Sequence, residues 1–297
     1  MSGMRRYDLD WLRIGAFAAL IGYHVGMLYV EWPFHVKSAY DGGPALTALM
    51  LALNPWRLPL LFVISGVATG FMMRGLTRAA LSRQSVPRLL VPLVFGMFVV
   101  VVPQVYFELT EARRYSGSFF AFWGQYLRLN QGFGTAVPTW NHLWFVAYLV
   151  VYTMIVTAFA PKPSAVDAGP AVPHRAAMAA LLLGPWLYLW VLRMTLFPVF
   201  GSNHAMVRDA YNHALYFAMF VFGFVLVGRP GLWLMIDRLR WPALVLALLG
   251  ATVFIGLSLE GDQSLPPGEW KRWVGRAGRE ALAWGAVLAA LGFAQQH

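Results

Sequence analysis

The chain has 297 residues, of which 59% are hydrophobic and only 12% are charged. Average soluble domains carry about twice that charged fraction, so this composition excludes an ordinary soluble globular protein. The net charge of +10 would suggest nucleic-acid binding in a soluble chain. In a membrane protein, basic cytoplasmic loops and anionic lipid explain it more simply, so we predict no nucleic-acid partner.

Two residue types limit the chemistry that is available to the chain. There is no cysteine, which excludes disulfides, Fe–S clusters, thiolate metal sites and a cysteine nucleophile. The histidines are scattered, and none lies three or four residues from another with a carboxylate nearby. We therefore predict no metal site and no bound cofactor.

Several apolar runs are long enough to cross a bilayer as helices, since ~20 residues at ~1.5 Å each cover ~30 Å of hydrocarbon. The sequence predicts an all-α fold, a polytopic transmembrane helical bundle of about eight spans in a single membrane-embedded domain over residues 1–297. The predicted spans are 9–30, 55–73, 87–107, 141–160, 177–197, 214–227, 241–259 and 280–293.

The first hairpin sets the predicted orientation. The first apolar run is too long for a signal peptide and no cleavage site follows Val30, which favours an uncleaved anchor. Residues 31–54 carry one Lys and no Arg, as an external loop should. Residues 74–88 hold four arginines and no acid, which is typical of a cytoplasmic loop. These patterns predict a cytoplasmic N-terminus.

The four arginines of residues 74–88 are Arg74, Arg78, Arg83 and Arg88. The favoured role of these arginines is to set the membrane topology and to contact lipid. The alternative is recognition of an anionic cytosolic ligand, because the planar guanidinium group suits phosphate oxygens.

The first span carries a polar face. Ten residues separate Arg13 from His24, and eleven helical steps of ~100° return to within about 20° of the starting direction. Asp10 lies three residues before Arg13, where it can pair with that arginine. Since charges inside a membrane are costly, this face predicts one wall of a polar channel or active site. The alternative is that Arg13 reaches the headgroups and His24 bonds a neighbouring helix.

The second span, 55–73, begins with Arg57 and contains Ser65. Gly66 and Gly70 are four residues apart, so we expect a neighbouring helix to approach the backbone closely there.

An aromatic-rich segment, 108–141, precedes the fourth span. Aromatic residues in such numbers are typical of an interfacial belt or a helix on the membrane, and a sugar-binding lining is the alternative. His142 begins the fourth span, where composition favours an interfacial side chain.

Four stretches together resemble the membrane acyltransferase 3 family, bacterial enzymes that move acyl groups onto cell-surface glycans, antibiotics and lipids. They are Asp10 to His24 with its Arg-x10-His spacing, Arg57 to Gly66, Arg88 to Pro92, and His142 to Val146. The long loop before the fourth span resembles the branch that decorates periplasmic glucans, including by succinyl transfer. Family members usually have more spans, so the resemblance implies that the last two helices are missing and the domain is incomplete at its C-terminus. The chain would then be a fragment, a shorter variant or an inactive relative.

The resemblance implies a multi-pass O-acyltransferase of the bacterial inner membrane that moves an acetyl or succinyl group from cytosolic acyl-CoA, a co-substrate, to a hydroxyl of a glycan or other envelope acceptor. Its other partners would be membrane lipids. His24 and Arg13 are the predicted catalytic residues, with His24 as the base, since an imidazole titrates near neutral pH. The predicted donor- or substrate-binding residues are Asp10, Arg57, Ser65, Arg88, His142 and Trp144.

Other classes of protein fit the same residues. A transporter or flippase would also place Arg and His in a membrane helix, as part of a proton or anion pathway. A noncatalytic, truncated relative would keep the fold without turnover. Direct transfer and an acyl-histidine intermediate both remain open for the enzyme.

Overall fold

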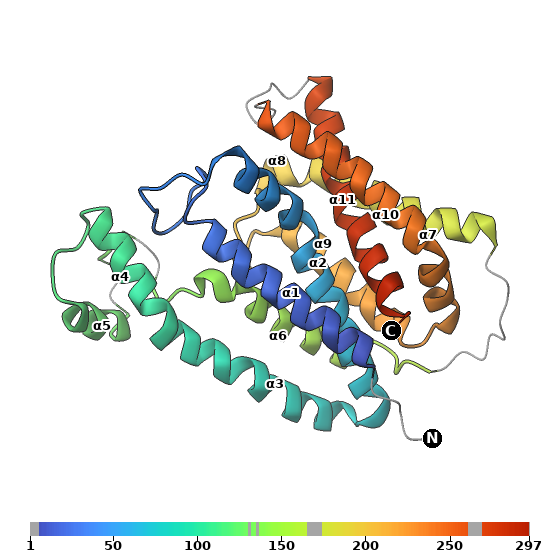
Figure 1. Ribbon diagram of the computed structural model, residues 1–297. Helices are drawn as coiled ribbons and strands as arrows, with labels where there is room; N and C mark the ends of the chain where they lie inside the picture. Colours follow the sequence, from blue (N-terminus) through green and yellow to red (C-terminus); the bar gives the residue numbers. More distant parts are fainter. Residues whose placement is uncertain (1–5, 130–131, 135–136, 165–173, 261–268, 297) are drawn as a thin grey trace. The chain divides into compact units, whose positions relative to one another are not determined.

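The computed structural model describes residues 6–129, 132–134, 137–164, 174–260 and 269–296, and within these ranges the chain forms helices and no strand (Figure 1). The all-α prediction is therefore confirmed for the described residues. The chain divides into two compact units, residues 1–26, 42–75 and 161–297 in the first and residues 27–41 and 76–160 in the second. Each is described by itself.

The first unit is a helical bundle in which α10 and α11 lie side by side and α2 packs on α9 (Figure 1). Its helices are α1 (Tyr7–Gly26), α2 (Gly43–Gly75), α7 (Arg175–Thr195), α8 (Phe197–Phe200), α9 (Ala210–Leu226), α10 (Pro230–Leu259) and α11 (Trp270–Ala294).

Small residues let α2 and α9 approach until their backbones touch. A Cβ atom added at Gly66 would collide with the carbonyl of Phe220, and one added at Gly223 would collide with the carbonyl of Val63. A Cβ atom added at Gly70 would meet the side chain of Val227 at 2.8 Å and the carbonyl of Phe224 at 3.2 Å. The predicted close approach at Gly66 and Gly70 is confirmed, and the neighbouring helix is α9.

We expect Gly66→Ala to destabilise the first unit, because a methyl group there meets backbone atoms that cannot rotate away. Overpacking of this kind costs about 1–3 kcal/mol or more. Thermal unfolding in detergent should show a lower midpoint. Gly184→Ala in α7 is the control, since nothing lies within 4 Å of its added Cβ. Equal midpoints for the two variants would contradict this account of the packing.

Five helical segments of the described chain are long and apolar enough to cross a membrane: Gly43–Gly75, Arg78–Glu111, Asn141–Phe159, Arg175–Thr195 and Pro230–Leu259. The helix Ala210–Leu226 is apolar but shorter. Neither α1 nor α11 is among the five, which is consistent with the charged residues that both contain. The count of eight spans and the cytoplasmic N-terminus stay predictions.

The start of the second predicted span was wrong. Helix α2 begins at Gly43 and not near Pro55, and Pro55 and Pro59 both lie inside it. Each proline removes one backbone donor from the helix. Two side chains in the same stretch donate to other carbonyls of the helix: the Trp56 indole to Ala52 at 2.9 Å and the Arg57 guanidinium to Asn54 at 3.0 Å. The predicted loop 31–54 is therefore helical over its second half.

The end of the first predicted span was also wrong, because α1 stops at Gly26. A Cβ atom at Gly26 would collide with Met50. In the following turn, Lys37 Nζ donates to the carbonyls of Met27 and Val30 at 2.9 and 2.6 Å. These bonds satisfy carbonyls that a longer helix would have used.

Three predicted loops are largely helical. Residues 78–88 belong to α3, residues 230–240 open α10, and residues 270–279 open α11. Much of the predicted linker 162–175 lies outside the described residues. Charged side chains in these segments made them look like loops, although several of those charges are bound to other helices.

Two arginines of the basic segment hold helix ends within their own units. In the first unit, Arg74 donates to the carbonyls of Pro163 and Val227. In the second, Arg78 donates to the carbonyls of Ala158 and Ala160 at the end of α6. Terminal carbonyls of a helix need such donors, so these two arginines have a structural role.

The second unit holds the aromatic-rich segment. Its helices are α3 (Arg78–Phe95), the π-helix η1 (Gly96–Val100), α4 (Val101–Glu111), α5 (Phe119–Leu127), the 3₁₀ helix η2 (Asn141–Leu143) and α6 (Trp144–Phe159). Phe122 and Tyr126 are fully buried in a hydrophobic cluster with Val101, Val105 and Phe133. The interpretation as an interfacial belt was wrong for these rings, because they pack on one another and form a core.

Candidate functional site

Three arginines line a cavity of about 340 Å³ in the first unit: Arg57 of α2, Arg193 of α7 and Arg279 of α11. Residues of α1 and α9 and of the loop 201–209 complete the lining. We call it the arginine cavity. Its volume is near the lower end of the ~300–1,000 Å³ range of small-molecule sites, so it suits a compact ligand or one end of a longer ligand.

Arg57 is the arginine whose buried surroundings hold no carboxylate partner among the described residues. Its side chain is 6% exposed, and its guanidinium carbon lies 3.4 Å from the centroid of the Tyr23 ring. Asn54 Nδ2 donates to the Tyr23 hydroxyl at 2.5 Å, which fixes that ring. Arg57 Nε has no hydrogen-bond partner among the described residues. A buried cationic donor is thus left unsatisfied at the wall of the cavity.

Arg193 and Arg279 share one carboxylate. Glu280 Oε1 accepts from Arg193 Nε at 2.8 Å and from Arg279 Nη1 at 2.6 Å, and Glu280 is completely buried. The Arg193 guanidinium also lies over the rings of Phe197 and Tyr211, at 4.3 and 4.8 Å. One carboxylate between two arginines leaves an excess of positive charge beside the cavity.

A chain of hydrogen bonds places His204 at the cavity. Asn212 Nδ2 donates to both carboxylate oxygens of Asp209, at 2.8 and 2.9 Å, so its Oδ1 faces Ser202 and accepts from that hydroxyl at 2.9 Å. Ser202 Oγ lies 3.2 Å from His204 Nε2. Since the hydroxyl proton is used on Asn212, Nε2–H is the donor of that bond.

Burial lowers the pKa of His204 from 6.5 to about 4, with Arg57 adding to the decrease and Asp209 opposing it. The imidazole is therefore neutral at physiological pH. It contributes hydrogen-bonding groups to the cavity but no charge. The arginines supply the positive potential of the cavity.

The low pKa of His204 predicts a pH dependence of stability. Between pH 6.5 and about 4 the unfolded chain binds a proton at this histidine and the folded protein does not. The free energy of unfolding is therefore unaffected by this histidine above pH 6.5. It decreases by about 1–3 kcal/mol as the pH falls toward 4. We expect unfolding midpoints of His204→Gln to vary less over this range than those of wild type. An unchanged slope would contradict the burial of a neutral imidazole.

His24 lies in α1 directly after Tyr23, whose ring lines the arginine cavity. His24 itself is not among the lining residues. Its Nδ1 is 2.7 Å from the carbonyl of Leu20. Because a carbonyl only accepts, Nδ1 carries the hydrogen and the lone pair of the neutral ring is on Nε2. In this tautomer Nε2 can accept a proton, as a general base must.

Arg13 and Asp10 form the predicted pair, with Arg13 Nη2 at 3.2 Å from Asp10 Oδ1. The Arg13 side chain is half exposed, and Arg13 lies nearly three helical turns from Tyr23, the residue of α1 that lines the arginine cavity. The structure therefore does not bring Arg13 into that cavity.

The remaining predicted site residues lie apart from the arginine cavity or in the other unit. In the first unit, the Ser65 hydroxyl donates to Leu61 O at 2.7 Å. In the second, Arg88 is exposed on α3, His142 Nδ1 lies 3.0 Å from Gln104 Oε1, and Trp144 packs edge-on against Tyr148. Arg57 is the predicted binding residue that lines the cavity.

The lining residues that sequence reasoning missed include Arg193, Arg279, Tyr211 and His204. Arg193 offered a usable signal, since it interrupts the apolar run 177–197 and charges in such runs are expensive. The loop of His204 and the charged segment before Glu280 gave no pattern that joins them to Arg57. Only the packing of α2, α7, α9 and α11 does so.

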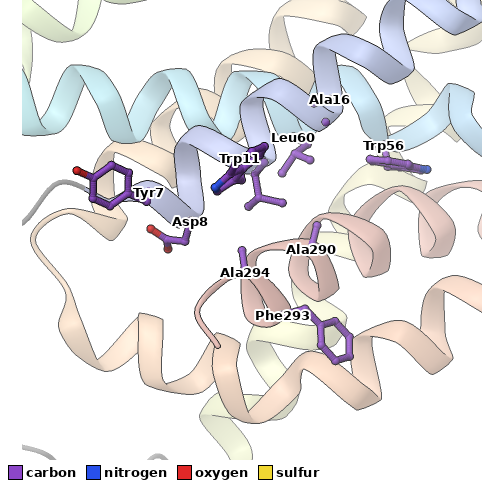
Figure 2. A pocket seen from close by; sticks show the side chains of 11 residues that line it. Tyr7, Asp8, Trp11, Ala16, Trp56, Leu60, Ala290, Phe293 and Ala294 are labelled. Atoms are coloured by element: carbon purple, nitrogen blue, oxygen red, sulfur yellow. The ribbon is translucent and has the colours of Figure 1, made fainter. Parts of the chain in front are cut away.

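A second, apolar pocket of about 630 Å³ lies between α1, α2 and α11. Figure 2 shows Trp11 of α1 and Leu60 of α2 on one side and Ala290 and Ala294 of α11 on the other, with Asp8 near one end. Its lining is mostly carbon, which suits apolar groups more than a charged ligand.

The described residues form an all-helical structure with five candidate membrane spans and an arginine-lined cavity, which indicates a polytopic membrane protein. Residues 6–293 match the family model described as an acyltransferase domain, and the chain belongs to the acyltransferase 3 family. A comparison with curated proteins gave no match. A comparison with solved structures gave none either.

Proposed function

We propose that the protein is an O-acyltransferase of the bacterial inner membrane. It moves an acyl group, acetyl or succinyl, from cytosolic acyl-CoA to a hydroxyl of a glycan or other envelope acceptor. The observation that carries this proposal is the family match over residues 6–293, which includes α1 with His24 and every helix of the arginine cavity.

His24 is the proposed general base. Its Nε2 takes the proton of the acceptor hydroxyl as that oxygen attacks the thioester carbonyl carbon. The carbon–sulfur bond then breaks, CoA leaves as a thiolate, and the imidazolium returns the proton to it. The bond between Nδ1–H and Leu20 O supports this role, since it orients the ring and keeps the lone pair on Nε2.

The other predicted residues keep proposed roles in binding. Arg13, held by Asp10, would position the donor on its side of α1, about 16 Å along the helix from His24. Arg57 would bind donor or substrate from the arginine cavity. The proposed role of the other four residues is also to bind donor or substrate. They are Ser65 in the first unit and Arg88, His142 and Trp144 in the second.

The test is release of CoA from acetyl-CoA and from succinyl-CoA by the purified protein in lipid, detected through the free thiol. We expect acceptor-dependent release of CoA, and a rate about tenfold or more lower in Arg13→Ala, since a charged hydrogen bond to the donor is lost. Proton-coupled uptake of a solute without release of CoA would support a carrier instead. A folded protein that shows neither activity would be the noncatalytic relative.

A further inference from the structure

The arginine cavity contains two buried polar groups that no described residue satisfies. Arg57 Nε is one, and the hydroxyl of Tyr211 is the other. Both residues line the cavity, and both are nine-tenths or more buried. A buried donor without a partner costs about 1–3 kcal/mol, more when it is charged, so such groups mark positions where a bound molecule completes the hydrogen bonding.

The charge around the cavity selects the kind of molecule. Arg57, Arg193 and Arg279 line it. Glu280 is shared by Arg193 and Arg279 through Oε1, whereas its Oε2 has no partner among the described residues. Asp209 accepts from the neutral amide of Asn212 and keeps its charge, so three guanidinium groups face two carboxylates. His204 is neutral at physiological pH. The balance at the wall is positive, and guanidinium groups match the oxygens of carboxylate and phosphate.

We propose that the arginine cavity binds a small oxyanion, a carboxylate or phosphate group, that accepts hydrogen bonds from Arg57 Nε and the Tyr211 hydroxyl. The positive potential of Arg193 and Arg279 strengthens its binding. This site goes beyond the proposed reaction, because it holds an anion whether or not acyl transfer follows. The anionic group belongs either to the molecule being transferred, as a free carboxylate, or to a phosphate-bearing ligand.

The volume of about 340 Å³ supports a single compact anionic group. Two contacts restrain the guanidinium of Arg57: its carbon lies 3.4 Å from the centroid of the Tyr23 ring, and Nη1 donates to Asn54 O at 3.0 Å. Such preorganisation lowers the entropy lost when the anion binds.

Isothermal titration of the purified protein with succinate and with inorganic phosphate tests this proposal. We expect binding of at least one anion, weakened about tenfold or more in Arg57→Gln and about threefold to tenfold in Tyr211→Phe. Tyr211→Phe preserves the ring packing, so it reports on the hydroxyl if Arg57→Gln fails to fold. Arg238→Gln, which removes an exposed arginine from α10, is the matched control and should bind as wild type does.

Binding of succinate alone identifies a carboxylate ligand, and binding of phosphate alone identifies a phosphate ligand. Absence of binding for both anions at millimolar concentration, or unchanged affinity in Arg57→Gln and Tyr211→Phe, would overturn the proposal. These titrations need no turnover. Anion binding without CoA release would therefore contradict the proposed function alone, and CoA release without anion binding would contradict the anion site alone.

Discussion

His24→Gln is expected to lower kcat for CoA release by about 10²–10⁴, the usual contribution of a general base. Glutamine can still donate a hydrogen bond toward the Leu20 carbonyl that His24 now contacts at 2.7 Å, but it has no basic nitrogen. The measurement is the initial rate of thiol release at saturating acyl-CoA, together with thermal unfolding to show that the variant is folded.

His174→Gln is the matched control for this variant. His174 is exposed and precedes α7, away from the residues that line the arginine cavity. We expect it to keep the wild-type rate. Near-normal turnover in folded His24→Gln protein would remove His24 from the mechanism and make a group that lines the arginine cavity, such as His204, the base to examine.

Glu280→Gln is expected to destabilise the first unit by about 3–5 kcal/mol, the usual cost of removing one partner from a buried ion pair. The amide would leave the guanidinium groups of Arg193 and Arg279 buried side by side without a counter-charge. Chemical or thermal unfolding in detergent measures the loss.

Glu269→Gln removes an exposed carboxylate just before the same helix and serves as the control. Its stability should match that of wild type within about 0.5 kcal/mol, since the side chain is exposed and makes no capping hydrogen bond to α11. A Glu280→Gln variant as stable as Glu269→Gln would show that Glu280 does not hold the two arginines together.

The residues that could be predicted from sequence are those whose signal is local. The apolar runs predicted helices, and the spacing of Gly66 and Gly70 predicted the close packing that α9 provides. The Arg-x10-His spacing pointed to the family that the match over residues 6–293 shows. Arg57 was chosen as a binding residue, and it lines the arginine cavity.

What could not be predicted depends on contacts between distant segments. Charged residues such as Arg279 looked like loop residues because nothing nearby in the chain shows that Glu280 pairs with Arg193, 87 positions away. The rings of Phe122 and Tyr126 looked interfacial because aromatic residues are common both in cores and at membrane surfaces. Helix starts were misplaced where prolines lie inside a helix whose carbonyls accept from side chains.

Acyl transfer by the protein is tested by following the acyl group itself. Membrane vesicles containing the protein would receive acetyl-CoA or succinyl-CoA with an isotope label in the acyl carbons, and envelope glycans would then be analysed for label bound as an ester. We expect label on the acceptor with wild type and none above background with His24→Gln. Label that stays on CoA in the presence of folded wild-type protein and acceptor would contradict it.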